Sequence, residues 1–251
     1  MADMIQYSVD EHIAKIVLNR PAANTLDEPA ARLLYEAVQD ARMSDEVRVI
    51  YLTGSGGVFC GGLDLRSVDL SDTDTIVRLH RSLFDPIAKE IYSCAKPVVC
   101  AMNGSASGAG LMFALACDLT YAVEQSRLAF TFVERGLIPA CGGTYLIPAL
   151  VGEKKALEIV LRAKTYKASN ALAEGLLTGV YATVDELARE TYQIAQELAG
   201  RSPLVLNLVK KAMRSRTIER FDEQLRLEEE LQAVAVAAPS FREGVEKFLK
   251  R

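Results

Sequence analysis

Two glycine-rich turns, each following an apolar run, constrain this 251-residue chain more than any other feature. The first turn spans residues 59–65 (Phe-Cys-Gly-Gly-Leu-Asp-Leu) and follows the apolar run 47–53. The second spans residues 103–110 (Asn-Gly-Ser-Ala-Ser-Gly-Ala-Gly) and follows the run 97–102. Because glycine has no side chain, each turn is able to present unobstructed backbone N–H groups. Two such donors aimed at one point form an oxyanion hole, which stabilises a negatively charged carbonyl oxygen.

The spacing of apolar residues predicts an α/β chain whose last part is helical. Apolar runs and alternation favour strands at residues 5–9, 13–19, 47–53, 97–102, 119–123 and 128–132. Helical spacing favours helices at residues 30–41, 75–93, 107–116, 145–150 and 154–161. Four more helical patterns follow, at residues 184–199, 203–215, 218–237 and 241–251. We therefore expect a strand–helix core over residues 1–198 and a helical region over residues 199–251.

Composition and charge argue against several classes of protein. The net charge of −4 favours neither a nucleic-acid nor a general polyanion binder. The five cysteines are odd in number and show no Cys-x-x-Cys spacing, which argues against disulfides and zinc and favours a reducing cytoplasm. No run of about 18 apolar residues occurs, and residues 1–9 show no apolar signal core, so we expect no membrane partner.

The two turns, taken with further motifs, resemble the enoyl-CoA hydratase/isomerase (crotonase) superfamily. The further motifs are Ala-x-Ala-Cys-Asp at residues 114–118 and Gly-Leu-x-Pro-x-x-Gly-Gly-Thr at residues 136–144, and the similarity runs from about residue 5 to residue 251. The resemblance implies an α/β spiral of ββα turns closed by the helical C-terminal region. It also implies an acyl-CoA substrate, no permanently bound cofactor or metal, and assembly as a homotrimer or a dimer of trimers.

The resemblance places the two oxyanion donors on particular residues. The family's first donor follows the glycine of its F-S-A-G-x-D-L pattern, which here makes it the N–H of Leu63. The second lies at the middle glycine of its N-G-x-A-x-G-G-G run, which here is Ala109, between Gly108 and Gly110. Ala109 also opens a predicted helix, and the start of a helix favours an anionic oxygen. These residues would stabilise the enolate of a bound thioester.

The acids that perform the family's chemistry are missing. Hydratases that resemble this chain use two glutamates, and some isomerases use a carboxylate after the turn's proline. The matching positions here are Met112, Phe132 and Ala140. None of these side chains exchanges a proton, and general acid–base help is worth about 10²–10⁴-fold in rate. We therefore expect an isomerase-like or atypical reaction, and an apolar pocket floor made by the three residues.

Glu134 is the nearest remaining carboxylate. If the segment is extended, Glu134 points the same way as Phe132 two residues earlier and is a candidate for a lone base. The alternative is a surface ion pair with Arg135 or another neighbour. Further candidates, each with an ordinary packing role as the alternative, are His80, Cys141 and Tyr145.

The sequence gives only weak indications of the residues that would bind the CoA part of the substrate. Relatives hold adenine near an Arg-Pro turn and the first glycine turn, and Arg66 is a candidate phosphate partner. A tail of the form E-G-x-x-x-F-x-x-[KR] matches residues 243–251, for which a simple amphipathic helix is the alternative interpretation. The candidate substrate-binding residues are Ala23, Cys60, Leu65, Arg66, Gly108, Gly110, Met112, Phe132, Ala140, Phe248 and Arg251.

Three hypotheses about function stay open at this point. The first is an acyl-CoA enzyme that stabilises a thioester enolate in a backbone oxyanion hole. The second is an acyl-CoA-binding homologue with weak catalysis, in which the hole is kept and the acids are lost. The third is a structural subunit of a trimeric assembly.

Overall fold

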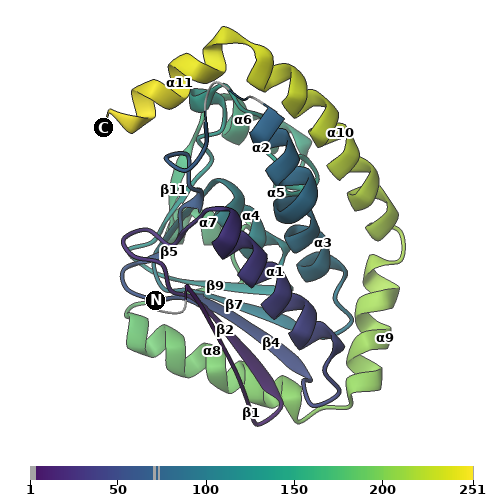
Figure 1. The fold of residues 1–251 in the computed structure, drawn as a ribbon. Helices are drawn as coiled ribbons and strands as arrows, with labels where there is room; N and C mark the ends of the chain where they lie inside the picture. Colours follow the sequence, from purple (N-terminus) through teal and green to yellow (C-terminus); the bar gives the residue numbers. More distant parts are fainter. Residues whose placement is uncertain (1–3, 70–71, 73, 251) are drawn as a thin grey trace.

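The computed structural model describes residues 4–69, 72 and 74–250, and it has the predicted α/β architecture (Figure 1). Its largest sheet has the strand order β1-β2-β4-β7-β9-β12. These strands are β1 (Ile5–Asp10), β2 (Ile13–Leu18), β4 (Val49–Gly54), β7 (Val98–Met102), β9 (Leu119–Val123) and β12 (Gly179–Tyr181). The β1–β2 pair is antiparallel, whereas β2, β4, β7, β9 and β12 run parallel to one another.

Two smaller sheets extend the fold toward the glycine turns. A four-stranded sheet has the order β11-β10-β8-β5, and a two-stranded sheet pairs β3 with β6. Their strands are β3 (Thr25–Leu26), β5 (Val58–Cys60), β6 (Gly62–Leu63), β8 (Ser105–Ser107), β10 (Arg127–Ala129) and β11 (Thr165–Lys167). Because β5 and β8 pair in parallel, the two glycine turns lie next to each other.

Helices cover both faces of the large sheet. On one face lie α1 (Glu28–Met43), α3 (Asp85–Ser93) and α4 (Gly108–Ala116), and on the other lies α8 (Val184–Ala199) (Figure 1). Alternation along β4 explains this arrangement, because Ile50 packs toward α1 and α3 while its neighbour Tyr51 packs toward α8. Strands buried on both faces are typical of parallel sheets.

The remaining helices lie between the strands and in the C-terminal part of the chain. They are α2 (Asp74–Leu79), the π-helix η1 (His80–Phe84), the 3₁₀-helix η2 (Val133–Arg135), α5 (Gly143–Val151), α6 (Glu153–Leu161), α7 (Ala168–Ala173), α9 (Pro203–Arg214), α10 (Ile218–Ala237) and α11 (Pro239–Leu249). From α9 onward the chain runs around the outside of the molecule, and α10 packs on α2, α3 and α5 before α11 reaches η2 (Figure 1). The domain boundary expected at residue 198 stays a prediction.

Two predicted elements differ from the structure. The strand expected at residues 128–132 ends at Ala129, and the chain then turns into η2. The helix expected at residues 75–93 is interrupted by the π-helix η1, in which the N–H of Asp85 donates to the carbonyl of His80. Both departures lie beside the pocket described below, where local sequence preference is overridden by tertiary packing.

Candidate active site

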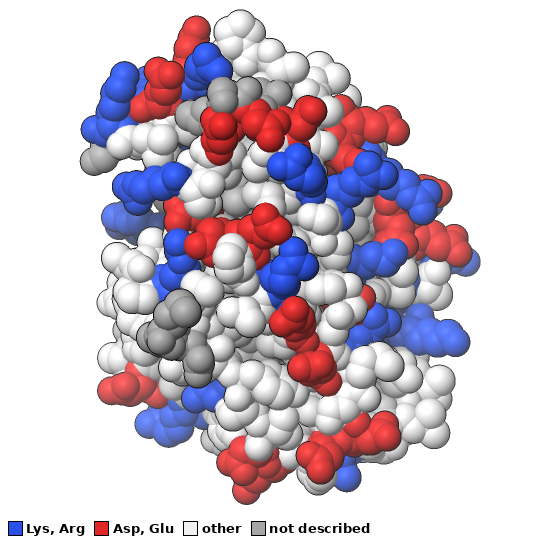
Figure 2. Space-filling model, in the orientation of Figure 1, with Lys and Arg blue, Asp and Glu red and all other residues white. Residues whose placement is uncertain are grey.

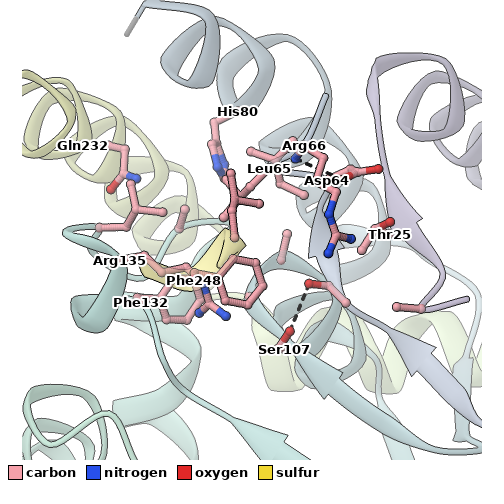
Figure 3. Close-up of a pocket in the computed structure, with 18 of the residues that line it drawn as sticks. Thr25, Asp64, Leu65, Arg66, His80, Ser107, Phe132, Arg135, Gln232 and Phe248 are labelled. Atoms are coloured by element: carbon pink, nitrogen blue, oxygen red, sulfur yellow. Dashed lines mark hydrogen bonds between the residues drawn. The ribbon is translucent and has the colours of Figure 1, made fainter. Parts of the chain in front are cut away.

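The two glycine turns meet at the start of α4. Gly62 has φ +81°, and a Cβ placed on it would lie 2.9 Å from both the Ala109 nitrogen and the Ser107 carbonyl oxygen. The Ser107 hydroxyl donates to the carbonyl of Gly61 at 3.0 Å (Figure 3). Only glycine at position 62 therefore allows the turn before Leu63 to approach α4 so closely.

The start of α4 keeps its backbone donors without a side-chain cap. Ser107 occupies the N-cap position but makes no capping hydrogen bond, because its hydroxyl is bound to the first glycine turn. The first four N–H groups of a helix have no partner within the helix, and Ala109 is among them. The nine-residue helix also places the positive end of its dipole at this point.

A pocket opens in front of this junction, and both Leu63 and Ala109 line it. Its walls come from the first glycine turn, α4, η1, the segment 132–140, α10 and α11 (Figure 3). Most of the lining is apolar. The residues that line it are Ala23, Thr25, Gly61, Leu63, Asp64, Leu65, Arg66, His80, Ser107, Gly108, Ala109, Phe132, Arg135, Leu137, Ile138, Ala140, Gln232, Phe248 and Leu249.

The structure brings most of the predicted substrate-binding residues to this pocket. Those that line it are Ala23, Leu65, Arg66, Gly108, Phe132, Ala140 and Phe248. The other predicted binding residues that the structure describes, Cys60, Gly110 and Met112, are not among the lining residues. Arg251 lies outside the described part of the chain.

Cys60 and Gly110 serve packing behind the pocket. A Cβ on Gly110 would lie 2.5 Å from the Cys60 sulfur, so the glycine lets α4 pack directly against β5. The Cys60 thiol donates to the carbonyl of Asn24 at 3.2 Å. Burial raises the pKa of Cys60 to about 12, so the thiol stays protonated at neutral pH.

Met112 is part of the core rather than of the pocket lining. Its side chain is fully buried, and its sulfur lies 2.8 Å from the position that a Cβ on Gly143 would take. The apolar floor expected from three residues is thus formed by two of them, Phe132 and Ala140. The position of Met112 in the middle of a short buried helix explains the difference.

Glu134 was expected to share a direction with Phe132, and this expectation was wrong. Residues 133–135 form η2, a 3₁₀-helix, so residues two apart do not face the same side. Phe132 is buried in the pocket wall, whereas Glu134 is exposed and is not among the lining residues. The carbonyl of Glu134 faces α11, because a Cβ on Gly244 would lie 2.8 Å from it.

His80 enters the pocket from η1 and belongs to a buried polar cluster. Its Nδ1 lies 3.8 Å from Asp85 Oδ1 and 3.8 Å from the Cys141 sulfur. Asp85 Oδ1 also accepts the N–H of Cys141 at 3.2 Å. The π-helix brings His80 and Asp85, five residues apart, onto one side of the chain, and such turns are frequent at functional sites.

The cluster positions the His80 ring, and the Cys141 thiol in it is not a nucleophile. Burial raises the pKa of the Cys141 thiol well above its usual range, and the charge of Asp85 acts in the same direction. Imidazole, thiol and carboxylate lie within 4.8 Å of one another, which is close enough to hold a metal ion. However, a metal needs the cysteine as a thiolate, which this environment disfavours.

Asp64 lines the pocket but is committed to an ion pair. Its Oδ2 lies 2.8 Å from the Arg20 guanidinium, which also binds Asp27 at 2.9 Å. The Arg20 hydrogen bond and charge, with the N–H of Arg66, lower the pKa of Asp64, although partial burial acts in the opposite direction. Asp64 therefore fixes the first glycine turn, as a carboxylate after a turn is expected to do.

Comparisons with known proteins identify the family of this chain. A model of the enoyl-CoA hydratase/isomerase family matches residues 8–251. The chain belongs to this family. It is 32% identical over its whole length to the 1,2-epoxyphenylacetyl-CoA isomerase of Escherichia coli, covering 97% of that protein. It is 35% identical to a protein of Rhodobacter capsulatus named "Probable enoyl-CoA hydratase", over 98% of this chain and 95% of that one.

Solved structures agree on the fold. The crystal structure of an enoyl-CoA hydratase/isomerase from Pseudoalteromonas atlantica superposes with a TM-score of 0.88 and is 29% identical, over 99% of this chain and 97% of that one. The crotonase fold is therefore established, and the family acts on CoA thioesters. The relatives' names include both an isomerase and a hydratase, so the reaction of this member has to be argued from its own residues.

Proposed function

We propose that this member of the family binds an acyl-CoA thioester in the pocket and stabilises its enolate with the N–H groups of Leu63 and Ala109. The observation that carries the proposal is the contact of the two glycine turns at the uncapped start of α4. Donors that are fixed before the reaction stabilise developing charge without further reorganisation. CoA enters as part of the substrate, with Arg66 and Ala23 on its side of the pocket.

We further propose that the reaction is isomerase-like, with one group moving one proton. In a 3-enoyl thioester, the base takes a proton from Cα, and the electrons of the C–H bond pass into the enolate. The oxygen of this enolate is held by the two backbone donors. The protonated base exchanges with solvent and donates a proton to Cγ, the thioester carbonyl re-forms, and the double bond moves from the β,γ to the α,β position.

His80 is the residue we assign to this proton transfer. Among the described residues that line the pocket, the ionisable ones are Asp64, Arg66, His80 and Arg135. Asp64 is engaged with Arg20, and the arginines keep their protons. Histidine exchanges a proton in the physiological range, and Asp85 lies at hand to orient the ring. The apolar residues at the family's acid positions favour a single base over the two that hydration needs.

The test uses 3-hexenoyl-CoA as substrate in deuterated water. We expect conversion to 2-hexenoyl-CoA and deuterium incorporation by the wild-type protein, together with very slow hydration of crotonyl-CoA. Leu63→Pro removes one donor and is expected to lower kcat by about 10²–10³-fold. Leu63→Ala keeps the N–H and is expected to lose far less activity. His80→Gln is expected to lower kcat by about 10²–10⁴-fold while hexanoyl-CoA still binds.

The outcomes separate the parts of this proposal. Fast hydration of crotonyl-CoA would show that the assigned reaction is wrong. Full turnover by Leu63→Pro would refute the assignment of the oxyanion hole. Full turnover by His80→Gln would refute the assignment of the proton transfer to His80. If Glu134→Gln alone abolished turnover, the sequence-based assignment of the base to Glu134 would be restored.

A second candidate function is acyl-CoA binding without strong catalysis. It is favoured by Met112, Phe132 and Ala140, because all three family acid positions are apolar. Tight binding of hexanoyl-CoA with no deuterium exchange in any enoyl-CoA would support it.

We also propose that the chain assembles as a trimer or a dimer of trimers, since α9 exposes apolar side chains that a second copy would cover.

A further inference from the structure

Gln232 is a buried polar side chain at one end of the pocket. It comes from α10 and lines the pocket beside Ile138 and Ala140, on the opposite side from Thr25 and Asp64 (Figure 3). Only 2% of its surface is exposed. A polar atom this deeply buried normally has at least one hydrogen-bond partner.

The amide of Gln232 has one partner and lacks another. The N–H of Ile138 donates to Oε1 at 3.1 Å, which fixes the oxygen end of the amide toward the backbone. The other end, Nε2, makes no hydrogen bond with any residue in the described part of the chain. Its two N–H groups are therefore unused donors, and the pocket wall beside Gln232 is mostly apolar.

The surroundings of Gln232 select the chemistry of what it would bind. Behind the pocket lies a small void that shares His80, Ala140 and Gln232 with it. The other residues around the void are Val77, Asp85, Glu228 and Glu229. The carboxylates of Asp85 and Glu229 there disfavour a negatively charged group. A neutral oxygen that accepts a hydrogen bond fits both the unused donors and this acidic boundary.

We infer that the acyl group of the substrate carries a neutral acceptor oxygen, such as a ketone or ether oxygen, which Gln232 Nε2 binds. This inference rests on the proposed function, because it assumes that an acyl-CoA occupies the pocket. The thioester would lie at Leu63 and Ala109, the chain would pass His80, and the oxygen would reach Gln232. A plain alkyl chain would leave the amide without an acceptor, at the full cost of its desolvation.

The experiment measures the dissociation constants of matched acyl-CoA pairs by calorimetry. The pairs are hexanoyl-CoA with 5-oxohexanoyl-CoA and octanoyl-CoA with 7-oxooctanoyl-CoA. For the wild-type protein we expect at least one oxo compound to bind about tenfold more tightly than its parent. A crystal structure with that compound is expected to show the ketone oxygen within hydrogen-bond distance of Gln232 Nε2.

Two variants and a control locate the effect. Gln232→Glu keeps an oxygen for the N–H of Ile138 but removes the donors, and it is expected to lose the tenfold preference. Gln232→Leu is expected to lose the preference while still binding the parent compounds, and the glutamate variant carries the test if the leucine variant does not fold. Gln224→Leu, on the same helix but outside the pocket lining, is expected to keep the preference, because Gln224 binds Thr144 instead.

Equal dissociation constants within every pair would overturn the inference and leave the proposed function standing. A crystal structure in which a buried water, and not the ketone, meets Gln232 Nε2 would overturn it as well. If none of the four compounds bound the wild-type protein, the proposed function would fail, and the inference with it.

Discussion

The buried carboxyl group of Glu228 binds the backbone of the loop at residues 142–144, beside the pocket. It accepts hydrogen bonds from the N–H of Gly142 at 2.8 Å, and from the N–H and hydroxyl of Thr144 at 2.7 and 2.5 Å. Burial nevertheless raises the pKa of Glu228 to about 8, helped by the charge of Asp85 and opposed by the three hydrogen bonds. The folded protein therefore keeps this group protonated at neutral pH.

This raised pKa predicts that stability falls as the pH rises. The unfolded chain ionises Glu228 near its ordinary pKa of about 4.3, whereas the folded chain holds the proton up to about pH 8. Between these values the unfolded state binds fewer protons, so the free energy of unfolding decreases by up to about 1.4 kcal/mol per pH unit from this group. Glu228→Gln removes that contribution. Urea unfolding of both proteins from pH 5 to 9 measures it.

The control for this prediction is Glu229→Gln, which changes the neighbouring carboxylate paired with Arg81 at the surface. It is expected to follow the wild-type slope. A difference in unfolding free energy between wild type and Glu228→Gln that stays constant from pH 5 to 8 would contradict the prediction.

At the scale of single residues, the sequence predicts what local geometry controls. Leu63 and Ala109 were expected at one site because the resemblance to the family places its two donors at these positions of the glycine turns, and both line the pocket. Gln232 was not foreseen, since its role depends on an amide held by Ile138, 94 positions away in the chain. The position of Asp85 beside His80 was not foreseen either, because it depends on a π-helix that no sequence pattern predicted.

At the scale of elements, α11 closes one wall of the pocket by packing closely on η2. A Cβ on Gly244 would lie 2.7 Å from the Cα and the carbonyl carbon of Arg135. One turn further on, Phe248 lines the pocket with the Arg135 guanidinium 4.2 Å from its ring centre. Glycine at position 244 is thus required by the contact of the two backbones rather than by its own dihedral angles.

We predict that Gly244→Ala moves α11 away from η2 and weakens ligand binding. The added methyl group meets rigid backbone, so the helix has to shift, and Phe248 shifts with it. The dissociation constant of hexanoyl-CoA is expected to rise about tenfold, measured by calorimetry. Gly200→Ala is the matched control, because its nearest contact would be an ordinary 3.5 Å. Unchanged binding by Gly244→Ala would show that α11 is not a wall of the ligand site.

The elements that the sequence predicted best are long helices, in which the helical spacing of apolar residues repeats several times. The helices at residues 184–199 and 218–237 were expected with the bounds that α8 and α10 have. Short strands such as β5, β6 and β8 were not predicted, because two or three residues carry no period of their own. These strands hold the glycine turns in register, so the part of the fold that builds the site was the least visible in the sequence.

At the scale of the whole molecule, the helical C-terminal region leaves an apolar surface uncovered. On the face shown in Figure 2, acidic and basic side chains are interspersed, with uncharged surface between them. In α9, no residue is buried, and five of its large apolar residues are exposed: Leu204, Val205, Leu208, Val209 and Met213. Contiguous exposed apolar surface on a folded protein marks an interaction site. No described helix is long and apolar enough to cross a membrane.

We predict that α9 is covered by another copy of the chain in solution. Light scattering after size exclusion is expected to give about three or six times the chain mass of 27.4 kDa. Leu204→Asp combined with Leu208→Asp places charge on this surface, where desolvation opposes burial, and the measured mass should fall toward that of one chain. Met43→Asp changes another exposed apolar residue, outside α9, and should leave the mass unchanged. A wild-type protein that runs as a single chain would contradict the prediction, and an oligomer that survives the double substitution would place the interface elsewhere.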